Sequence, residues 1–177
     1  KLCTCFDALA IGVHPDGRKT IIALEIKNTE TYPQVNLATA KWGAHRVATY
    51  TPFLQAADSP ISLATAPAEA FFYEPAYQMM RQTLLANEIV KGGEFSSSGF
   101  IYVQVIPDGN TELRSSQPSP GLPGASLADA WRSVLRNPAG YRVLSPDTLL
   151  AGAATDAHQD YLASRYGLTA PVPTVAG

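Results

Sequence analysis

Two apolar runs joined by a tight turn make up the start of the chain, and they constrain the fold more than any other feature. Residues 2–13 (LCTCFDALAIGV) and 19–27 (KTIIALEIK) flank the sequence HPDG. Pro15 and Asp16 suit the central positions of a type I turn, and Gly17 suits the left-handed residue that follows. The pattern therefore predicts a β-hairpin with a short loop and a bulge at Gly17.

The turn also sets which residues of the two strands face each other. If His14 lies opposite Arg18, the same register places Asp7 opposite Glu25. Lys27 lies two residues beyond Glu25 on one strand and therefore shares its face. Apart from these charged residues both faces of the hairpin are largely apolar, so we expect a sheet that is covered on both sides.

Predicted helices and strands alternate along the rest of the chain. Residues 28–74 show no clean period, which indicates a functional excursion or short irregular elements. No internal repeat and no shift in composition divides the sequence, so we expect a single domain over residues 1–177. Helical patterns occur at 75–91, 126–136 and about 145–166, and strand patterns occur at 99–107 and 141–144.

Composition excludes several classes of protein. The chain has 13 basic and 15 acidic residues, so any nucleic-acid binding must use a local patch and not bulk charge. Its apolar stretches are far shorter than the roughly 20 residues that cross a bilayer, so we expect no membrane partner. Its two cysteines, Cys3 and Cys5, form neither a disulfide framework nor a four-ligand zinc site, which predicts a cytoplasmic location.

The predicted pairing of Asp7 with Glu25 is unfavourable unless something compensates it. Directly opposed residues have Cβ atoms roughly 5 Å apart, where two carboxylates repel by roughly 3 kcal/mol at an effective dielectric constant of about 20. Protonation of one acid or a bound cation would relieve this repulsion, and carboxylate ligands suit Mg²⁺ or Mn²⁺. The alternative is an ordinary salt bridge between Glu25 and Lys27, with no metal and no catalysis.

Three motifs in this order resemble the PD-(D/E)XK nuclease superfamily, and more narrowly a bacterial group of restriction-endonuclease-like proteins. FDALAIGV, PDGR and IIALEIK followed by NTE are similar to its Asp…Glu-x-Lys core. YQMMRQTLLA at 77–86 matches the helix motif of that group, and PDGN at 107–110 matches the end of a later strand. The resemblance runs from about residue 5 to about residue 165. Phe6 replaces the superfamily's proline, and Asn28 replaces the tyrosine of the narrower group.

The resemblance implies a fold and a set of catalytic residues. The fold would be α/β, a restriction-endonuclease-like mixed β-sheet flanked by helices. Asp7 and Glu25 would hold Mg²⁺ (or Mn²⁺) with the backbone carbonyl of Ile26. Lys27 would orient the attacking water and offset the charge that builds on the phosphate. Members often begin with a helix that supplies a further acid, and we expect that helix to be missing before Lys1.

Further residues are candidates for substrate contact. Gln78 and Arg81 lie three apart on one helix face, where Arg81 would bind a phosphate or a carboxylate, or would only support the residues of the site. Lys41 and Arg46 flank Trp42, which predicts either a nucleic-acid contact by charge and stacking or a solvated loop with one buried tryptophan.

Two functions follow from the resemblance. The first is metal-dependent phosphodiester hydrolysis of DNA, with DNA as partner and a homodimer expected for double-strand cleavage. The alternative is a non-catalytic member of the same fold that binds nucleic acid or a protein. Because Asp7, Glu25 and Lys27 are all present, the sequence favours the enzyme.

Overall fold

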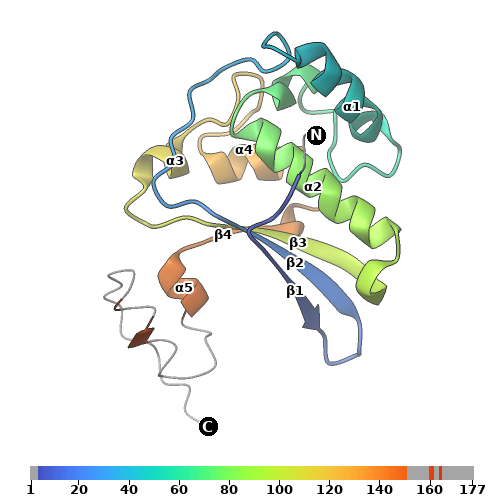
Figure 1. Cartoon of the computed structure of the whole chain (residues 1–177), viewed down its shortest axis with the longest axis vertical. Coiled ribbons are helices and arrows are strands. Elements are labelled where there is room, and N and C mark those ends of the chain that lie inside the picture. Colours follow the sequence, from blue (N-terminus) through green and yellow to red (C-terminus); the bar gives the residue numbers. More distant parts are fainter. Residues whose placement is uncertain (1–3, 151–159, 162–163, 165–177) are drawn as a thin grey trace.

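A mixed β-sheet is the centre of the structure and confirms the predicted α/β fold. The computed structural model describes residues 4–150, 160, 161 and 164, and four strands of this part of the chain form one sheet. They are β1 (Ala8–Val13), β2 (Lys19–Ile26), β3 (Ser97–Val105) and β4 (Tyr141–Leu144), in that order across the sheet. β1 runs antiparallel to β2, whereas β2, β3 and β4 are parallel (Figure 1).

The hairpin of β1 and β2 has the predicted turn and register. The His14 N–H donates to the Arg18 carbonyl at 2.8 Å, and Gly17 adopts the left-handed conformation with φ of 84°. The ladder then runs from Val13 opposite Lys19 to Ala8 opposite Leu24. Within these six pairs every residue lies opposite the one expected from the sequence.

The prediction that the hairpin is covered on both faces is wrong. β1 is an edge strand, and much of it is exposed: Leu9 by 38% and Val13 by 65%. On β2, Ile21 and Ala23 are fully buried, while Ile26 on the opposite face is 41% exposed. The physical reason is that the neighbouring long helix packs on β2 and β3, so its cover does not extend to the edge.

The helices of the described residues agree with the predicted ones and fill the long unassigned segment. The predicted helices at 75–91 and 126–136 are confirmed, and the segment 28–74 contains a helix and a 3₁₀ turn. The predicted final helix, from about 145 to 166, begins as α5 at Pro146, and most of it after Leu150 lies outside the described residues. The helices are α1 (Gly43–Gln55), α2 (Ala76–Lys91), α3 (Thr111–Ser115), α4 (Leu127–Val134) and α5 (Pro146–Leu150), with 3₁₀ turns at Ala68–Phe72, Glu94–Ser96 and Pro138–Gly140.

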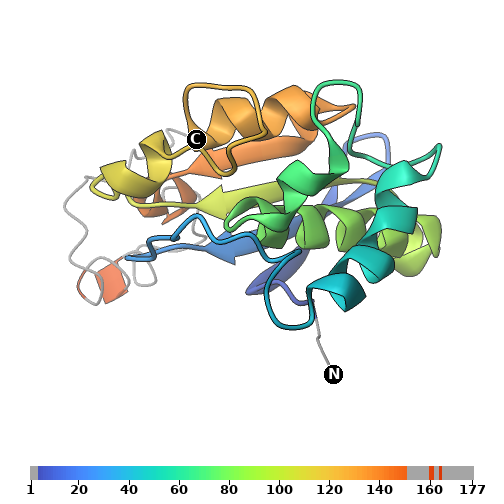
Figure 2. The same cartoon turned by 90° about the horizontal axis from the view of Figure 1, so that it is seen from above.

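The core lies between the sheet and the helices that cover one face of it. α2 packs on β2 and β3, and α4 packs on β4, as Figures 1 and 2 show from two directions. Phe71 meets Trp131 edge to face, and Tyr102 packs against Tyr141, all four fully or almost fully buried. The buried face of α2 belongs to the same core.

The parallel part of the sheet brings three strand ends together. Lys27, directly after β2, donates its N–H to Val105 at the end of β3. Ile106, directly after β3, donates in the same way to Leu144 at the end of β4. The carboxyl ends of β2, β3 and β4 therefore share one edge of the sheet, which is where ligand sites of parallel sheets usually lie.

Candidate active site

Glu25 and Lys27 lie on the buried face at the end of β2. Their residues are only 5% and 4% exposed, and alternation along the strand points both side chains toward α2. The Lys27 Nζ lies 2.8 Å from Glu25 Oε1, which makes a buried ion pair. A buried charge is tolerated only when it is paired and hydrogen-bonded, so this pair needs further partners.

Two glutamines of α2 supply these partners. Gln78 donates from Nε2 to Glu25 Oε1 at 2.6 Å and accepts from Lys27 Nζ at 2.8 Å. Gln82 donates from Nε2 to the other carboxylate oxygen of Glu25. Because residues four apart share a helix face, one helix reaches both carboxylate oxygens at once.

Tyrosines extend this network away from the carboxylate. Tyr102 of β3 donates its hydroxyl to Gln82 at 2.6 Å, and Tyr32 donates to Gln78 at 3.2 Å. The Lys27 ammonium also lies 5.5 Å from the centre of the Tyr32 ring. Each glutamine oxygen and nitrogen that faces the ion pair therefore has a defined role, and the amide orientations are fixed by their partners.

Asp7 lies next to this network but outside it. Its side chain is exposed, and Oδ2 accepts the Ile26 N–H at 2.7 Å. Its own N–H bonds the carbonyl of Leu24 at 3.1 Å, although Leu24 is already the ladder partner of Ala8. Asp7 and Ala8 therefore both lie opposite Leu24, as in a β-bulge. The regular ladder ends at the pair of Ala8 and Leu24, so Asp7 and Glu25 do not form the next pair that the sequence predicts.

The Asp7 carboxylate consequently takes the place of a strand neighbour for Ile26. In a strand, the N–H and carbonyl of one residue point to the same side, so the Ile26 carbonyl also faces the β1 edge. Asp7 and the Ile26 backbone are together at this edge, and Glu25 lies on the adjacent buried face. The three predicted metal ligands are therefore neighbours at the end of β2, with different exposure.

Arg81 of α2 contacts the segment that leads into β1. Its Nε donates to Thr4 Oγ1 at 3.0 Å, and its guanidinium lies 5.2 Å from the centre of the Tyr77 ring. Gln78 and Arg81 thus contact different parts of the molecule: Gln78 contacts the ion pair, and Arg81 contacts the segment that leads into β1. The two residues that the sequence places together on one helix face therefore have different partners.

Burial and charge shift several pKa values around the site. Burial acts to lower the pKa of Lys27, but its contacts with Glu25 and Tyr32 outweigh this effect and hold it above its ordinary value. Burial raises the pKa of Glu74, against the lowering effects of the Gln78 N–H and of nearby cations. Burial also raises the pKa of Tyr102 well above its usual range. The raised pKa of Lys27 and its contacts with Glu25 and Gln78 therefore suit an ammonium group that donates hydrogen bonds.

Both carboxylates at the site have acceptor positions that the hydrogen bonds described above do not use. Glu25 accepts three hydrogen bonds, two at Oε1 and one at Oε2, whereas a carboxylate offers about four acceptor positions. Asp7 uses only Oδ2 in the hydrogen bond to Ile26, which leaves Oδ1 outside that bond. Among the residues described, no three of the types His, Cys, Asp and Glu gather as a metal cluster. A cation here would thus rely on two carboxylates with carbonyl and water oxygens.

Sequence reasoning missed Gln82, Tyr32 and Tyr102 as parts of the site. A signal for Gln82 was present, because it lies four residues after Gln78 and so on the same face of the predicted helix. Tyr32 and Tyr102 carry no comparable signal. Their places depend on how the 28–74 segment and β3 pack around α2.

The basic and aromatic segment before α1 is exposed. Trp42 is 66% exposed, with the Lys41 ammonium 5.8 Å from its ring centre. Arg46 instead donates to the carbonyl oxygens of Leu37 and Lys41. The alternative of a solvated loop with a buried tryptophan is wrong, because the Trp42 ring is exposed and has the Lys41 ammonium beside it.

No helix in the described part of the chain is both long and apolar enough to cross a membrane.

Comparison with known proteins supplies a family for this arrangement. No curated protein and no solved structure matches the chain. The sequence model of the family described as "Restriction Endonuclease associating with ARP" matches residues 1–167 of 177. This match includes every strand, Asp7, the Glu25–Lys27 pair and the glutamines of α2. The chain therefore belongs to the REase-ARP family, a restriction-endonuclease family.

Proposed function

We propose that the chain is a metal-dependent nuclease of the PD-(D/E)XK type that hydrolyses phosphodiester bonds of DNA. The observation that carries this proposal is the buried Glu25–Lys27 pair, held by two glutamines at the carboxyl edge of a mixed sheet. Membership of a restriction-endonuclease family supports the same reaction. Asp7, Glu25 and Lys27 supply the Asp…Glu-x-Lys set of that type.

The donor set suits Mg²⁺ (or Mn²⁺). These ions bind through one or two carboxylates, carbonyl oxygen and water, and they do not need a protein cage. Asp7, Glu25 and the Ile26 carbonyl would hold the ion, and the spare acceptor positions on both carboxylates support this assignment. When bound, such an ion activates water and neutralises charge on the phosphate.

Lys27 acts as a hydrogen-bond donor in this proposal. Its pKa is held above the ordinary value, so the ammonium form is retained and can orient water or a phosphate oxygen. The water oxygen forms a bond to phosphorus, one phosphorus–oxygen ester bond breaks, and the proton that the water loses is balanced by protonation of the departing alkoxide oxygen. Gln78 contacts both Lys27 and Glu25, so it positions the ammonium group and the carboxylate relative to each other.

Cleavage of both strands of a duplex would require two such sites. Each chain offers one Asp7–Glu25–Lys27 set, so we propose a homodimer for double-strand cleavage. Analytical ultracentrifugation of the full chain, alone and with a duplex, measures this directly. A monomer in both samples would contradict the dimer and leave single-strand cleavage as the reaction.

A cleavage assay tests the proposal. Supercoiled and single-stranded DNA are incubated with the full chain and Mg²⁺ or Mn²⁺, and we expect cleavage that EDTA abolishes. Lys27→Ala should lower the rate by about 10²-fold or more, as for loss of a donor that stabilises transition-state charge. Lys91→Ala removes a cation of the same kind that is paired at the far end of α2, and it serves as the control.

The non-catalytic alternative has an observation in its favour. Gln78, Gln82 and Lys27 satisfy most of the Glu25 carboxylate without any ligand, as a purely structural ion pair would require. If the chain binds DNA but cleaves none with either metal, this alternative is correct. Cleavage that is equal in the wild type and in Lys27→Ala would also contradict the proposed mechanism.

A further inference from the structure

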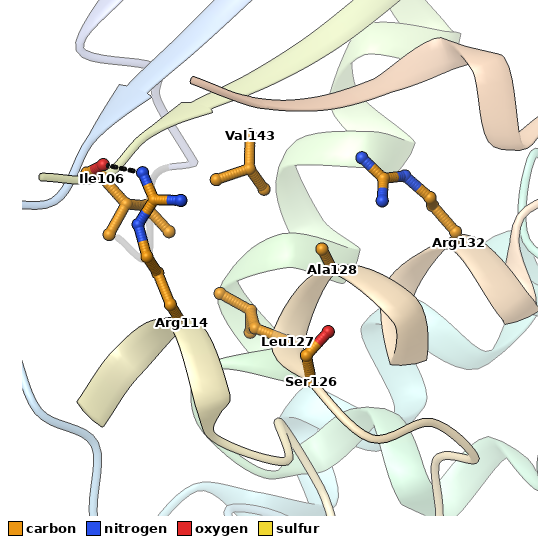
Figure 3. A pocket seen from close by; sticks show the side chains of 7 residues that line it. All are labelled: Ile106, Arg114, Ser126, Leu127, Ala128, Arg132 and Val143. Atoms are coloured by element: carbon orange, nitrogen blue, oxygen red, sulfur yellow. Dashed lines mark hydrogen bonds between the residues drawn. The ribbon is translucent and has the colours of Figure 1, made fainter. Parts of the chain in front are cut away.

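A pocket with two arginines in its lining lies at the same sheet edge as Glu25 and Lys27, beside the ends of β3 and β4. It has a volume of about 280 Å³ and opens between α3, α4 and the sheet (Figure 3). Its polar lining comes from Arg114, Arg132 and Ser126, and no carboxylate lines it. The apolar lining residues are Ile106, Leu127, Ala128 and Val143.

Arg132 gives this pocket an available cation. Within the described residues its guanidinium has no hydrogen-bond acceptor and no acidic partner, and it lies 5.7 Å from the centre of the Tyr141 ring. The neighbouring Trp131 is fully buried, so the start of the Arg132 side chain is held in place on α4. The five N–H donors of this half-buried arginine therefore remain for a ligand.

Arg114 forms a rigid wall on the other side of the pocket. Its Nε donates to the Pro107 carbonyl at 3.1 Å, and Nη2 donates to the Ile106 carbonyl, as the dashed line in Figure 3 shows. Nη2 also pairs with Asp108, which is exposed and offsets part of the charge. Since Nη1 takes no part in these bonds, it remains a donor for a bound anion.

The first turn of α4 adds to the positive character of the pocket. Ser126 caps the helix by accepting the Asp129 N–H at 3.2 Å, and Ser126, Leu127 and Ala128 all line the pocket. The amino-terminal end of a helix dipole favours an anion. Asp129 opposes this effect in part, but its carboxylate accepts the Ser126 hydroxyl and does not line the pocket.

The position of the pocket indicates which anion it binds. β2 and β4 are two strand spacings apart in the sheet, which is about 10 Å, so one DNA backbone lying across the strand ends can reach both the Glu25–Lys27 pair and this pocket. The apolar walls suit the sugar that adjoins a phosphate. We propose that Arg132 and Arg114 bind a backbone phosphate of the same DNA whose cleaved phosphate lies at Glu25 and Lys27.

This proposal rests on the proposed function and deepens it, because it names a substrate contact outside the catalytic residues. It predicts that Arg132 contributes to DNA affinity and not to the chemical step. The matched control is Arg142, an exposed arginine of β4. It pairs with Val103, and alternation along the strand points its side chain to the face of the sheet opposite to Tyr141.

The test measures binding of the full-length chain to a fluorescent duplex oligonucleotide by anisotropy, in EDTA so that no cleavage occurs. We expect Arg132→Gln to weaken binding about tenfold, the effect of losing a charged hydrogen-bond pair. The slope of log affinity against log salt should become shallower by about 0.9. Arg142→Gln should bind like the wild type. A second variant, Ala128→Glu, places a carboxylate in the pocket and should also weaken binding.

Three results would overturn the proposal, each in a distinct way. If wild-type DNA cleavage is observed but Arg132→Gln and Ala128→Glu bind as tightly as the wild type, the pocket assignment fails alone. If the wild type neither binds nor cleaves DNA, the proposed function fails with it. If NMR titration shows that inorganic phosphate binds at Arg132 while DNA affinity is unchanged in the variant, the pocket serves a free phosphate compound and not DNA.

Discussion

Two polar regions at the same edge of the sheet differ in how their charges are satisfied. At the end of β2, Glu25 and Lys27 are buried, and each is bonded to the other and to Gln78. At the end of β4, Arg132 lines an open pocket and has no acidic partner among the residues described. In the first region the charged groups are hydrogen-bonded to other protein groups, whereas in the second the Arg132 guanidinium is left to water or a ligand.

This difference determines what each region contributes to the fold. A buried ion pair must be completed by the folded chain, because an unpaired charge in the interior is very costly. An arginine beside an open pocket keeps its hydration, so folding does not depend on it. Substitutions at Glu25 or Lys27 should therefore change stability and activity together, and those at Arg132 should change binding alone.

The largest expected effect comes from breaking the buried pair. Lys27→Met leaves the Glu25 carboxylate buried without its cation and should lower the free energy of unfolding by about 3–5 kcal/mol. Arg132→Met should change it by no more than about 0.5 kcal/mol. Urea denaturation followed by circular dichroism measures both values.

A double variant checks the cause of that loss. Glu25→Gln combined with Lys27→Met removes both charges and should be more stable than Lys27→Met alone, since no uncompensated charge remains. Equal stability of the single and double variants would show that lost packing, and not the unpaired carboxylate, explains the effect.

Removing one glutamine should have a smaller effect. Gln82→Leu leaves Glu25 Oε2 and the Tyr102 hydroxyl without their partner, and it should cost about 1–3 kcal/mol of stability. Gln117→Leu is the control, because the side chain of this exposed glutamine donates to a backbone carbonyl, that of Leu122, and not to a buried charge. Thermal unfolding of both variants gives the comparison, and similar melting temperatures would contradict a structural role for Gln82.

High pH should destabilise the buried tyrosine pair of the core, Tyr102 and Tyr141. Burial raises the pKa of Tyr102 and Tyr141 in the folded protein above the value of about 10 in the unfolded chain. The folded state thus holds these protons longer, so stability is full below pH about 10 and falls as pH rises above it. Melting temperatures from pH 8 upward test this, with Tyr141→Phe expected to show a shallower fall. A steeper fall in that variant would contradict the assignment.

The smallest stability change is expected at Asp7. Asp7→Asn keeps an oxygen that can accept the Ile26 N–H, and the side chain is exposed, so the unfolding free energy without metal should change by less than about 1 kcal/mol. Binding of Mn²⁺, measured by isothermal titration calorimetry, should weaken clearly. A marked loss of stability without any change in Mn²⁺ affinity would make Asp7 a structural residue only.

The hairpin and its register could be predicted from the sequence, because a local turn determines them. Pro15, Asp16 and Gly17 set the loop, and each following pair is then fixed by alternation. The end of the ladder could not be predicted in this way. Asp7 bonds the Ile26 N–H through its side chain, and that choice between a side-chain and a backbone acceptor leaves no trace in periodicity.

The site was predictable where its parts are close in sequence. Glu25 and Lys27 follow from strand alternation, and Gln78 follows from the helix motif. Gln82 required the correct helix face, and Arg132 required knowledge that α4 lies against β4. Such contacts between distant segments arise from packing, which a single sequence does not reveal.

The parallel pairing of β2 with β3 has a consequence for the order of folding. β1 and β2 are joined by a short loop and can pair early, but α1 and α2 both lie between β2 and β3 in the chain. Pairing across so long a connection is slow, because the entropy of loop closure is lost before any contact compensates it. During synthesis the hairpin also leaves the ribosome before α2 does. The charges of Glu25 and Lys27 thus stay in water until α2 docks, and the site is completed in a late step of folding.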